Sequence, residues 1–368
     1  MLRTILAAAV VGGAAARTPE LVATLTGPMP TGITVSQKGR IFINFPRWGD
    51  PVTATVAELI GGKPVAFPPG LKQLVDPDKE PVQGLVSVQS VVVDPKDRLW
   101  ILDTGSVKFG PTHPGGPKLV GVELNSNQVF RTITFPPSVA LPSSYLNDVR
   151  FDLRRGQDGM AFITDSSPQG GIIVADLATG ESWRRLSGHA STRADANFRP
   201  VVGGQVLMQR KPGQPARPLN IGSDGIAMGA DGKRLYYCAL ASHRLYSVSI
   251  DKLVDREVSD ADVAESVHLV TIKPGSDGLE SDTAHRLYLT DYEHGAIERR
   301  EADGSLRPLV AAGRLDWPDT LSLATNGYLY FTNNELHRQA DYHGGKDLRD
   351  KTYEIFRVKV DAKPVMLK

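Results

Sequence analysis

Six polar positions recur just ahead of strand-like segments, and their residue types suggest the chemistry of this chain. They are Thr31, Gln89, Asn147, Asp224, Asp277 and Asp319. In the clearest copy, Gly275 to Asp291 (GSDGLESDTAHRLYLTD), a first strand runs through a polar turn into a second. An antiparallel hairpin returns to the end where it began. Carboxylates gathered at one end repel, and each raises the pKa of the other unless a cation or a basic partner lies between them. Because Thr31 and Gln89 are uncharged, we expect a polar ring that is acidic on one side only.

The elements that must position this ring are six repeated hairpins. Each pairs an alternating apolar strand with a return strand across a turn rich in Asp, Pro, Gly or Asn. The copies span residues 31–44, 89–103, 146–165, 223–237, 275–291 and 318–333. Further strand candidates between them make units of roughly 40 to 75 residues, a spacing typical of propeller blades. The sequence predicts an all-β fold, a single six-bladed β-propeller over residues 17–368, with Glu20–Leu25 beside Glu354–Val360 closing the ring.

Bulk composition narrows the class of partner. The chain has 368 residues, is 41% hydrophobic and carries a net charge of +1. This balance gives no electrostatic case for nucleic acid or an anionic membrane. The pattern predicts a monomer that binds a small molecule and has no membrane span.

The N-terminus reads MLRTILAAAVVGGAAARTPE. A basic residue, a short apolar run and an A-x-A pattern indicate a signal peptide over residues 1–16, and hence a secreted or periplasmic protein. A frayed apolar helix is the alternative. The single cysteine, Cys238, has alternating apolar neighbours, which favours a buried structural thiol over a nucleophile.

Other side chains are expected on the same face as the ring. His243 and His294 follow return strands and are the general acid/base candidates, although solvated loop histidines are the simpler interpretation. Candidate ligand-binding residues are Gln89, Tyr145, Tyr292, Asn333 and Asn334, and Trp317 and Phe45 are further candidates for an aromatic wall. The alternative for the aromatic residues is packing between blades. For each ring aspartate, the alternative is the cap of a tight turn.

Several longer segments carry a family resemblance. These are GLVSVQSVVVDPKDRLWILDTG (84–105), YLNDVRFD (145–152), SDGIAMGADGKRLYYCALAS (223–242), and WPDTL with FTNNEL (317–336). Together they resemble the major royal jelly / yellow family over nearly the whole chain after the N-terminus. The resemblance implies a secreted six-bladed propeller whose relatives include proteins of dopachrome conversion, amine binders and nutritive proteins. The chain lacks the disulfide cysteines and N-x-[ST] sites of insect members, as expected for a bacterial member.

A more distant similarity concerns the chemistry. LNDVRFD and the two SDG motifs resemble the senescence-marker protein / gluconolactonase family, which holds a divalent metal on the propeller axis. That resemblance implies Asn147, Asp224 and Asp277 as metal ligands, with Ca²⁺ the expected ion. The glutamate of that family's first blade has no match, because Thr31 stands there. Asp319 is the candidate to supply the missing charge, since hard cations accept any suitable oxygen.

Two functions follow from these expectations. The first is a metal-assisted enzyme acting on a small cyclic substrate, by lactone hydrolysis or dopachrome-type isomerisation, with Asp277, His294 and His243 as catalytic residues. The second is a binding protein for a small aromatic or amine ligand. Motifs for nucleotide, zincin, serine-hydrolase and dithiol chemistry are absent from the sequence.

Overall fold

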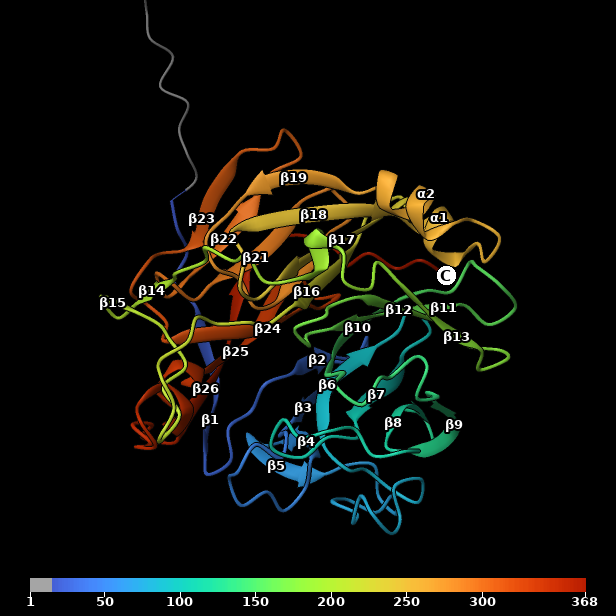
Figure 1. Cartoon of the computed structure of the whole chain (residues 1–368), viewed down its shortest axis with the longest axis horizontal. Helices are drawn as coiled ribbons and strands as arrows, with labels where there is room; N and C mark the ends of the chain where they lie inside the picture. The colour runs from blue at the N-terminus through green and yellow to red at the C-terminus, as the bar shows by residue number, and fades with distance from the viewer. Residues whose placement is uncertain (1–14) are drawn as a thin grey trace, which may run out of the picture.

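Six four-stranded antiparallel sheets surround a common axis in the computed structural model, which describes residues 15–368 (Figure 1). The prediction of a six-bladed β-propeller is confirmed. The proposed signal peptide falls almost entirely outside the described residues. No helix within residues 15–368 is long and apolar enough to cross a bilayer.

The first three blades follow one another along the chain, each running from the axis outward. Blade 1 contains β2 (Ile33–Val35), β3 (Ile41–Asn44), β4 (Val56–Ile60) and β5 (Lys63–Ala66). Blade 2 contains β6 (Val88–Val93), β7 (Arg98–Thr104), β8 (Pro117–Glu123) and β9 (Gln128–Thr134). Blade 3 contains β10 (Leu146–Asp152), β11 (Met160–Asp165), β12 (Ile172–Asp176) and β13 (Ser182–Arg185).

The second half repeats this order and closes the ring. Blade 4 contains β16 (Ser223–Met228), β17 (Arg234–Ala239), β18 (Arg244–Ser249) and β19 (His268–Ile272). Blade 5 contains β20 (Leu279–Ser281), β21 (Leu287–Asp291), β22 (Ala296–Arg300) and β23 (Leu306–Val310). Blade 6 contains β24 (Trp317–Leu323), β25 (Tyr328–Asn334), β26 (Thr352–Lys359) and β1 (Glu20–Thr26). Because β1 pairs antiparallel with β26, both ends of the chain complete one sheet, as predicted.

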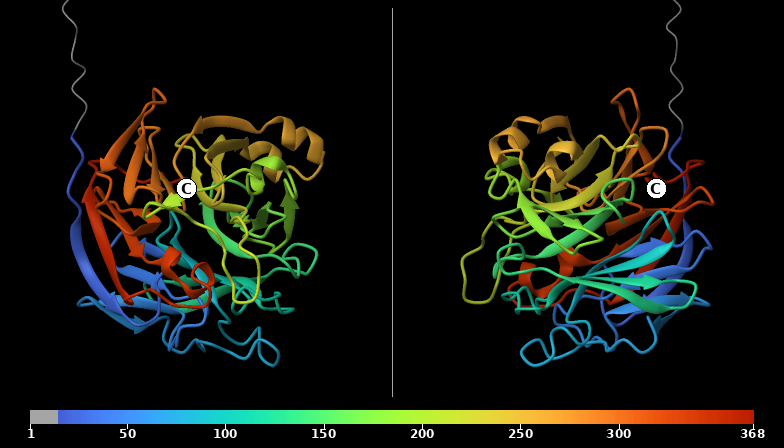
Figure 2. Two further views of the ribbon diagram at one scale, coloured as in Figure 1. Left: turned by 60° about the vertical axis from the view of Figure 1, so that its left-hand side comes forward. Right: turned by 90° about the vertical axis from the view of Figure 1, so that its right-hand side faces the viewer.

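Short elements decorate the blades. The hairpin of β14 (Val201–Val202) and β15 (Gln205–Val206) lies within a long connection between blades 3 and 4. Two short helices, α1 (Ile250–Val254) and α2 (Asp260–Glu265), lie between β18 and β19 (Figure 2). Three 3-10 turns complete the described elements: η1 (Ala190–Thr192), η2 (Leu336–Arg338) and η3 (Ala340–Tyr342).

The core lies between neighbouring blades, where alternating strand residues interdigitate. In one such layer, Trp100 of blade 2 stacks on Phe151 of blade 3 with ring centroids 5.5 Å apart. Cys238 is fully buried and free, as predicted for a structural thiol, and burial raises its pKa.

Four inner strands have the same irregularity, a shift in strand pairing near their first residues. The register of pairing shifts within β6, β10, β16 and β24, at the residue pairs Val88/Ser90, Leu146/Val149, Ser223/Ile226 and Pro318/Leu321. A bulge inserts a residue and re-aims side chains out of the regular alternation. The inserted positions include Gln89, Asn147, Asp224 and Asp319, so the bulges present the predicted ring to the axis.

The glycine of each SDG motif permits close packing around the axis. A Cβ on Gly225 would lie 2.3 Å from the Asp277 carbonyl oxygen, and one on Gly278 would lie 2.3 Å from that of Asp319. The Gly278 amide donates to the Asp319 carbonyl at 2.9 Å. These glycines therefore bring the inner strands of blades 4, 5 and 6 into direct backbone contact.

Candidate functional site

A cavity of about 350 Å³ opens on the axis at the end where the inner strands begin. Its lining combines side chains at the starts of inner strands with loops of the same face. The axial cavity is lined by Trp48, Gln89, Phe109, Tyr145, Asn147, Ser166, Asp224, Asp277, Asp319, Leu336 and Tyr342, with Gln209, Lys211, Arg217, Gln339 and Asp341 among its other lining residues. The structure thus brings together Gln89, Tyr145 and the four expected metal ligands.

Asp224, Asp277 and Asp319 form what we call the carboxylate floor. Their residues are only 4%, 6% and 4% exposed. The Asn147 amide nitrogen donates to Asp224 Oδ2 at 2.8 Å, and Asp224 and Asp277 lie close enough to hydrogen-bond one another. Trp317 Nε1 donates to Asp277 Oδ2 at 2.8 Å. Two carboxyl groups in hydrogen-bonding contact require a shared proton or a cation.

Asp319 is held differently. Its Oδ2 accepts from Asn334 Nδ2 at 2.8 Å, and its Oδ1 accepts from Thr320 Oγ1 at 3.2 Å. Both oxygens are therefore engaged within blade 6. Asn334, which was expected to contact ligand, instead positions a floor carboxylate.

Burial controls the protonation of the floor. Burial, with the charge of Asp277, raises the pKa of Asp224 well above its usual value. Burial likewise raises the pKa of Asp277 to about 6, while the Trp317 hydrogen bond opposes that rise. The pKa of Asp319 is also raised well above normal, first by burial and then by Asp277. The floor carboxyl groups therefore keep their protons to a higher pH than free aspartic acids do.

An aromatic wall rises beside the floor from blades 1 to 3. The Trp48 and Phe109 rings stack with centroids 4.8 Å apart, and Phe109 lies 5.1 Å from Tyr145. Trp48 Nε1 donates to the Tyr145 hydroxyl at 2.6 Å, which in turn donates to Gln89 Oε1 at 3.0 Å. Phe109 is 53% exposed and has a positive φ of 55°. Part of the Phe109 ring is therefore free to contact a molecule in the cavity.

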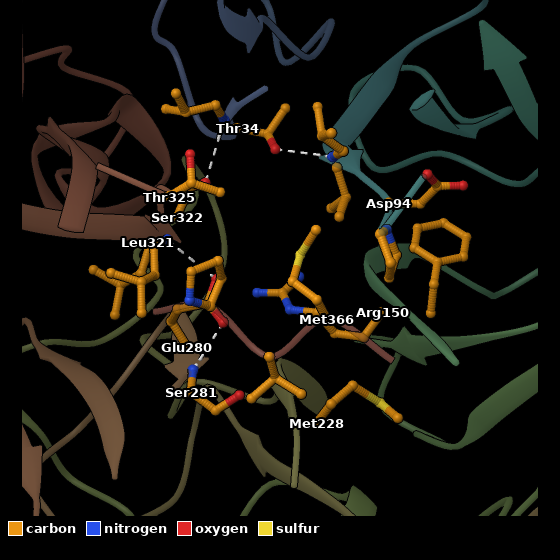
Figure 3. A pocket seen from close by; sticks show the side chains of 18 of the residues that line it. Thr34, Asp94, Arg150, Met228, Glu280, Ser281, Leu321, Ser322, Thr325 and Met366 are labelled. Carbon is orange, nitrogen blue, oxygen red and sulfur yellow. Dashed lines mark hydrogen bonds between the residues drawn. The ribbon is translucent and has the colours of Figure 1, made fainter. Parts of the chain in front are cut away.

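A separate, smaller cavity of about 80 Å³ lies at the opposite end of the axis (Figure 3). Arg150 lies there and pairs with Asp148 at 2.8 Å, while its second terminal nitrogen donates to the Leu279 carbonyl at 2.9 Å. Met366 of the C-terminal segment also lines this smaller cavity. Unlike the floor carboxylates, Asp148 has an arginine partner.

The two histidines do not reach the axial cavity. His243 Nε2 lies 2.7 Å from Glu293 Oε2, and its ring packs edge-on against Phe198. His294 is exposed and contacts Asp291 at 2.9 Å. Neither histidine lines the cavity. The expectation that they stand above the floor is wrong, because each histidine pairs instead with a carboxylate outside the cavity lining, Glu293 or Asp291.

Three further expected positions lie away from the cavity. Tyr292 is fully buried, stacks on Trp317 with centroids 4.1 Å apart and donates to the Leu240 carbonyl. Phe45 belongs to the core. Asn333 accepts from the Asp316 backbone and donates to Glu354. For Tyr292 and Phe45, packing outweighs binding. Thr31 is also buried and tied to Asn44 and the Gln89 carbonyl.

The loop residues of the site were not predicted from the sequence. Trp48 and Phe109 lie outside the repeated hairpins, and Lys211 and Arg217 come from the connection between blades 3 and 4. The only sequence signal for Lys211 and Arg217 was the length of the connection between blades 3 and 4. Trp317 was expected on the wall but acts as the donor that orients Asp277.

The donor chemistry bears on a bound metal. Asn147 uses its amide nitrogen toward Asp224 and leaves its oxygen available, and Asp224 and Asp277 are oxygen donors suited to a hard cation. A cation there would replace the proton the two acids share. Within residues 15–368, no group of three or more His, Cys, Asp or Glu side chains is arranged to hold a metal ion. Asn147, Asp224 and Asp277 would be the ligands of such a cation, because both oxygens of Asp319 already accept hydrogen bonds.

Fold and site define a six-bladed propeller with an acidic, aromatic-walled cavity on its axis. The chain belongs to the major royal jelly protein family, because the sequence model of that family matches residues 86–366. It is 27% identical over 252 residues to protein yellow of Drosophila melanogaster, covering 64% of this chain and 44% of that protein. It is 29% identical over 231 residues to protein yellow of Drosophila pseudoobscura pseudoobscura, covering 59% and 39%. The match thus spans less than half the length of these relatives.

Solved structures share the fold at low identity. Regucalcin of Agrobacterium tumefaciens, a calcium-binding protein, superposes with a TM-score of 0.53 at 13% identity, covering 94% of this chain and 96% of that one. A gluconolactonase of Xanthomonas campestris gives 0.53 at 10% identity, with the same coverage. A luciferin-regenerating enzyme gives 0.55 at 13% identity, covering 95% and 100%.

Proposed function

We propose that the axial cavity binds a small aromatic molecule that brings a positive charge to the carboxylate floor. The observation that carries this proposal is the burial of Asp224, Asp277 and Asp319 together at the closed end of the cavity. Burying a carboxylate without a partner is costly. A ligand ammonium would offset that cost and displace the shared proton of Asp224 and Asp277.

The wall supports an aromatic ligand. Trp48, Phe109 and Tyr145 offer ring faces and edges beside the floor, and such pairs contribute beyond simple burial. The Tyr145 hydroxyl is fixed between Trp48 and Gln89, so this side of the cavity is preformed. A volume of about 350 Å³ suits a single-ring or fused-ring molecule.

The positions of the two candidate acid/base histidines favour binding over catalysis. The residues expected to move protons, His243 and His294, do not line it. Acid–base work would fall to the Asp224–Asp277 pair alone.

A metal-assisted reaction is the second candidate, and the oxygen donors of Asn147, Asp224 and Asp277 favour it. A divalent cation such as Ca²⁺ on these residues would polarise a substrate carbonyl. The substrate would be a small cyclic molecule undergoing lactone hydrolysis or dopachrome-type isomerisation. Two structural neighbours, a calcium-binding protein and a gluconolactonase, support this candidate through their shared fold only.

Isothermal titration calorimetry with two matched ligands tests the first candidate. Tyramine and 4-ethylphenol share a ring and differ in the amine. In EDTA at pH 7.5, we expect tyramine to bind at least about 10-fold more tightly, because hydrogen bonds to charged groups contribute about 1.5–3 kcal/mol. Asp277→Asn should remove that preference. Asp341→Asn, at the mouth of the same cavity, is the matched control and should retain it. Equal binding of both ligands by the unmodified protein would rule out the charged floor as the recognition element.

Calcium titration tests the second candidate. Metal binding at the floor predicts a Ca²⁺ heat signal that Asp277→Asn abolishes and that competes with tyramine. Lactone turnover that persists unchanged in EDTA would exclude the metal-assisted mechanism.

We also infer export of the chain, supported by the signal-like residues 1–16. N-terminal sequencing of the protein from its native cells should begin near Arg17. An intact Met1 on the mature protein would contradict this.

A further inference from the structure

The mouth of the axial cavity carries charge of the opposite sign from its floor. The basic residues among its lining are Lys211 and Arg217, and both come from residues 207–219, which we call the strap. The strap is part of the long connection between blades 3 and 4, and it contributes Gln209, Lys211, Arg217 and Pro218 to the cavity lining. The cavity therefore has an acidic closed end and a basic open end.

The strap is held in place by its own backbone. Gln209 and Arg217 exchange two backbone hydrogen bonds, at 2.8 and 2.9 Å, so they face each other across a short antiparallel bridge. Leu207 and Leu219, at the two ends, are buried. The backbone of Arg217 is therefore held in a fixed position.

A second contact docks the strap on the far rim. The Arg210 amide donates to the Asp341 carbonyl at 2.7 Å, and the Gly344 amide donates to the Arg210 carbonyl at 2.8 Å. Lys211 Nζ pairs with Asp341 at 3.1 Å. The charge of Lys211 is thereby largely balanced, which leaves Arg217 as the uncompensated charge at the mouth.

The guanidinium of Arg217 makes no hydrogen bond or ion pair with any side chain or carbonyl in the part of the chain that the structure describes. A guanidinium presents a planar fork of donors that matches a carboxylate. Arg217, the aromatic wall and the floor carboxylates line the same cavity, so one ring-bearing ligand can meet all three.

We propose that the ligand is a dipolar aromatic molecule, with an ammonium at one end for the floor and a carboxylate at the other end for Arg217. This rests on the proposed function, since the floor fixes the cationic end. Arg217 is then a specificity-determining residue: it selects ligands that carry an anionic group opposite the amine.

Two probes isolate the outer group. 4-(Aminomethyl)benzoate and 4-(aminomethyl)benzamide share the ring and the ammonium and differ only in the charge at the far end. Calorimetry in EDTA at pH 7.5 and low salt should show the benzoate binding about 10-fold more tightly to the unmodified protein, as expected for a charge-assisted, partly exposed pair. Arg217→Ala should bring the two affinities together and leave that of the benzamide unchanged.

Arg314→Ala is the matched control, because Arg314 is exposed and lies outside the cavity lining. It should keep the preference for the benzoate. Unmodified protein that binds the two probes equally, or binds neither, or an Arg217→Ala variant that keeps the full preference, would overturn the proposal. Failure of the floor is a separate result: benzamide affinity would then be the same in unmodified protein and in Asp277→Asn.

Discussion

Replacing Asp277 with asparagine should raise stability at neutral pH, although it changes a buried residue that makes good hydrogen bonds. Burial raises the pKa of this carboxyl from 3.8 to about 6. The shift of about 2 units corresponds to roughly 3 kcal/mol, at 1.36 kcal/mol per unit. The amide keeps an oxygen for Trp317 Nε1 and supplies a permanent donor toward Asp224.

The direction in which stability changes with pH follows from proton binding by Asp277. Between pH 3.8 and about 6, the folded protein holds the Asp277 proton more strongly than the unfolded chain does. Stability therefore falls as pH rises through this window and levels off above it. Asparagine does not titrate, so the variant should lack this component.

Thermal unfolding in EDTA at pH 4 to 8 measures the effect. At roughly 2 °C per kcal/mol for a large domain, the melting temperature of the variant relative to the unmodified protein should rise by about 6 °C between pH 4 and pH 7.5. Asp341→Asn, an isosteric change at the mouth, should show no such trend. Parallel curves for Asp277→Asn and the unmodified protein would refute the raised pKa and the burial argument behind it.

Three further outcomes follow from the same contacts. Phe109→Ala should weaken tyramine binding several-fold with little change in melting temperature, because the ring is half exposed and stacks on Trp48; unchanged affinity by calorimetry would remove Phe109 from the site. Arg150→Met should destabilise the fold by about 3–5 kcal/mol in denaturant titration, since it leaves Asp148 buried without its partner; a loss below 1 kcal/mol would contradict the pairing. Cys238 should react with a thiol reagent only after denaturation, because it is fully buried, and rapid labelling of native protein would contradict this.

The fold was predictable because repetition supplies redundant signals. Six hairpins with alternating apolar residues fix the number of blades, and the pairing of β1 with β26 follows from the need to protect sheet edges. The positions of Asn147, Asp224, Asp277 and Asp319 followed from their equivalent places in the repeat. The bulges that present three of these side chains could not be read from the sequence, since a register shift depends on how both strands pair.

The rest of the site was not predictable because it breaks the repeat. Trp48, Phe109 and Arg217 lie in loops whose course depends on tertiary contacts. The misplacement of His294 has a related cause. The sequence shows that it follows a return strand but not that its side chain turns to Asp291.

A crystal structure with tyramine bound is the most direct test of the account. We expect the ammonium nitrogen within hydrogen-bonding distance of Asp224 or Asp277, with the phenol ring against Trp48 and Tyr145. An ammonium directed toward the mouth, or tyramine bound outside the axial cavity, would contradict it.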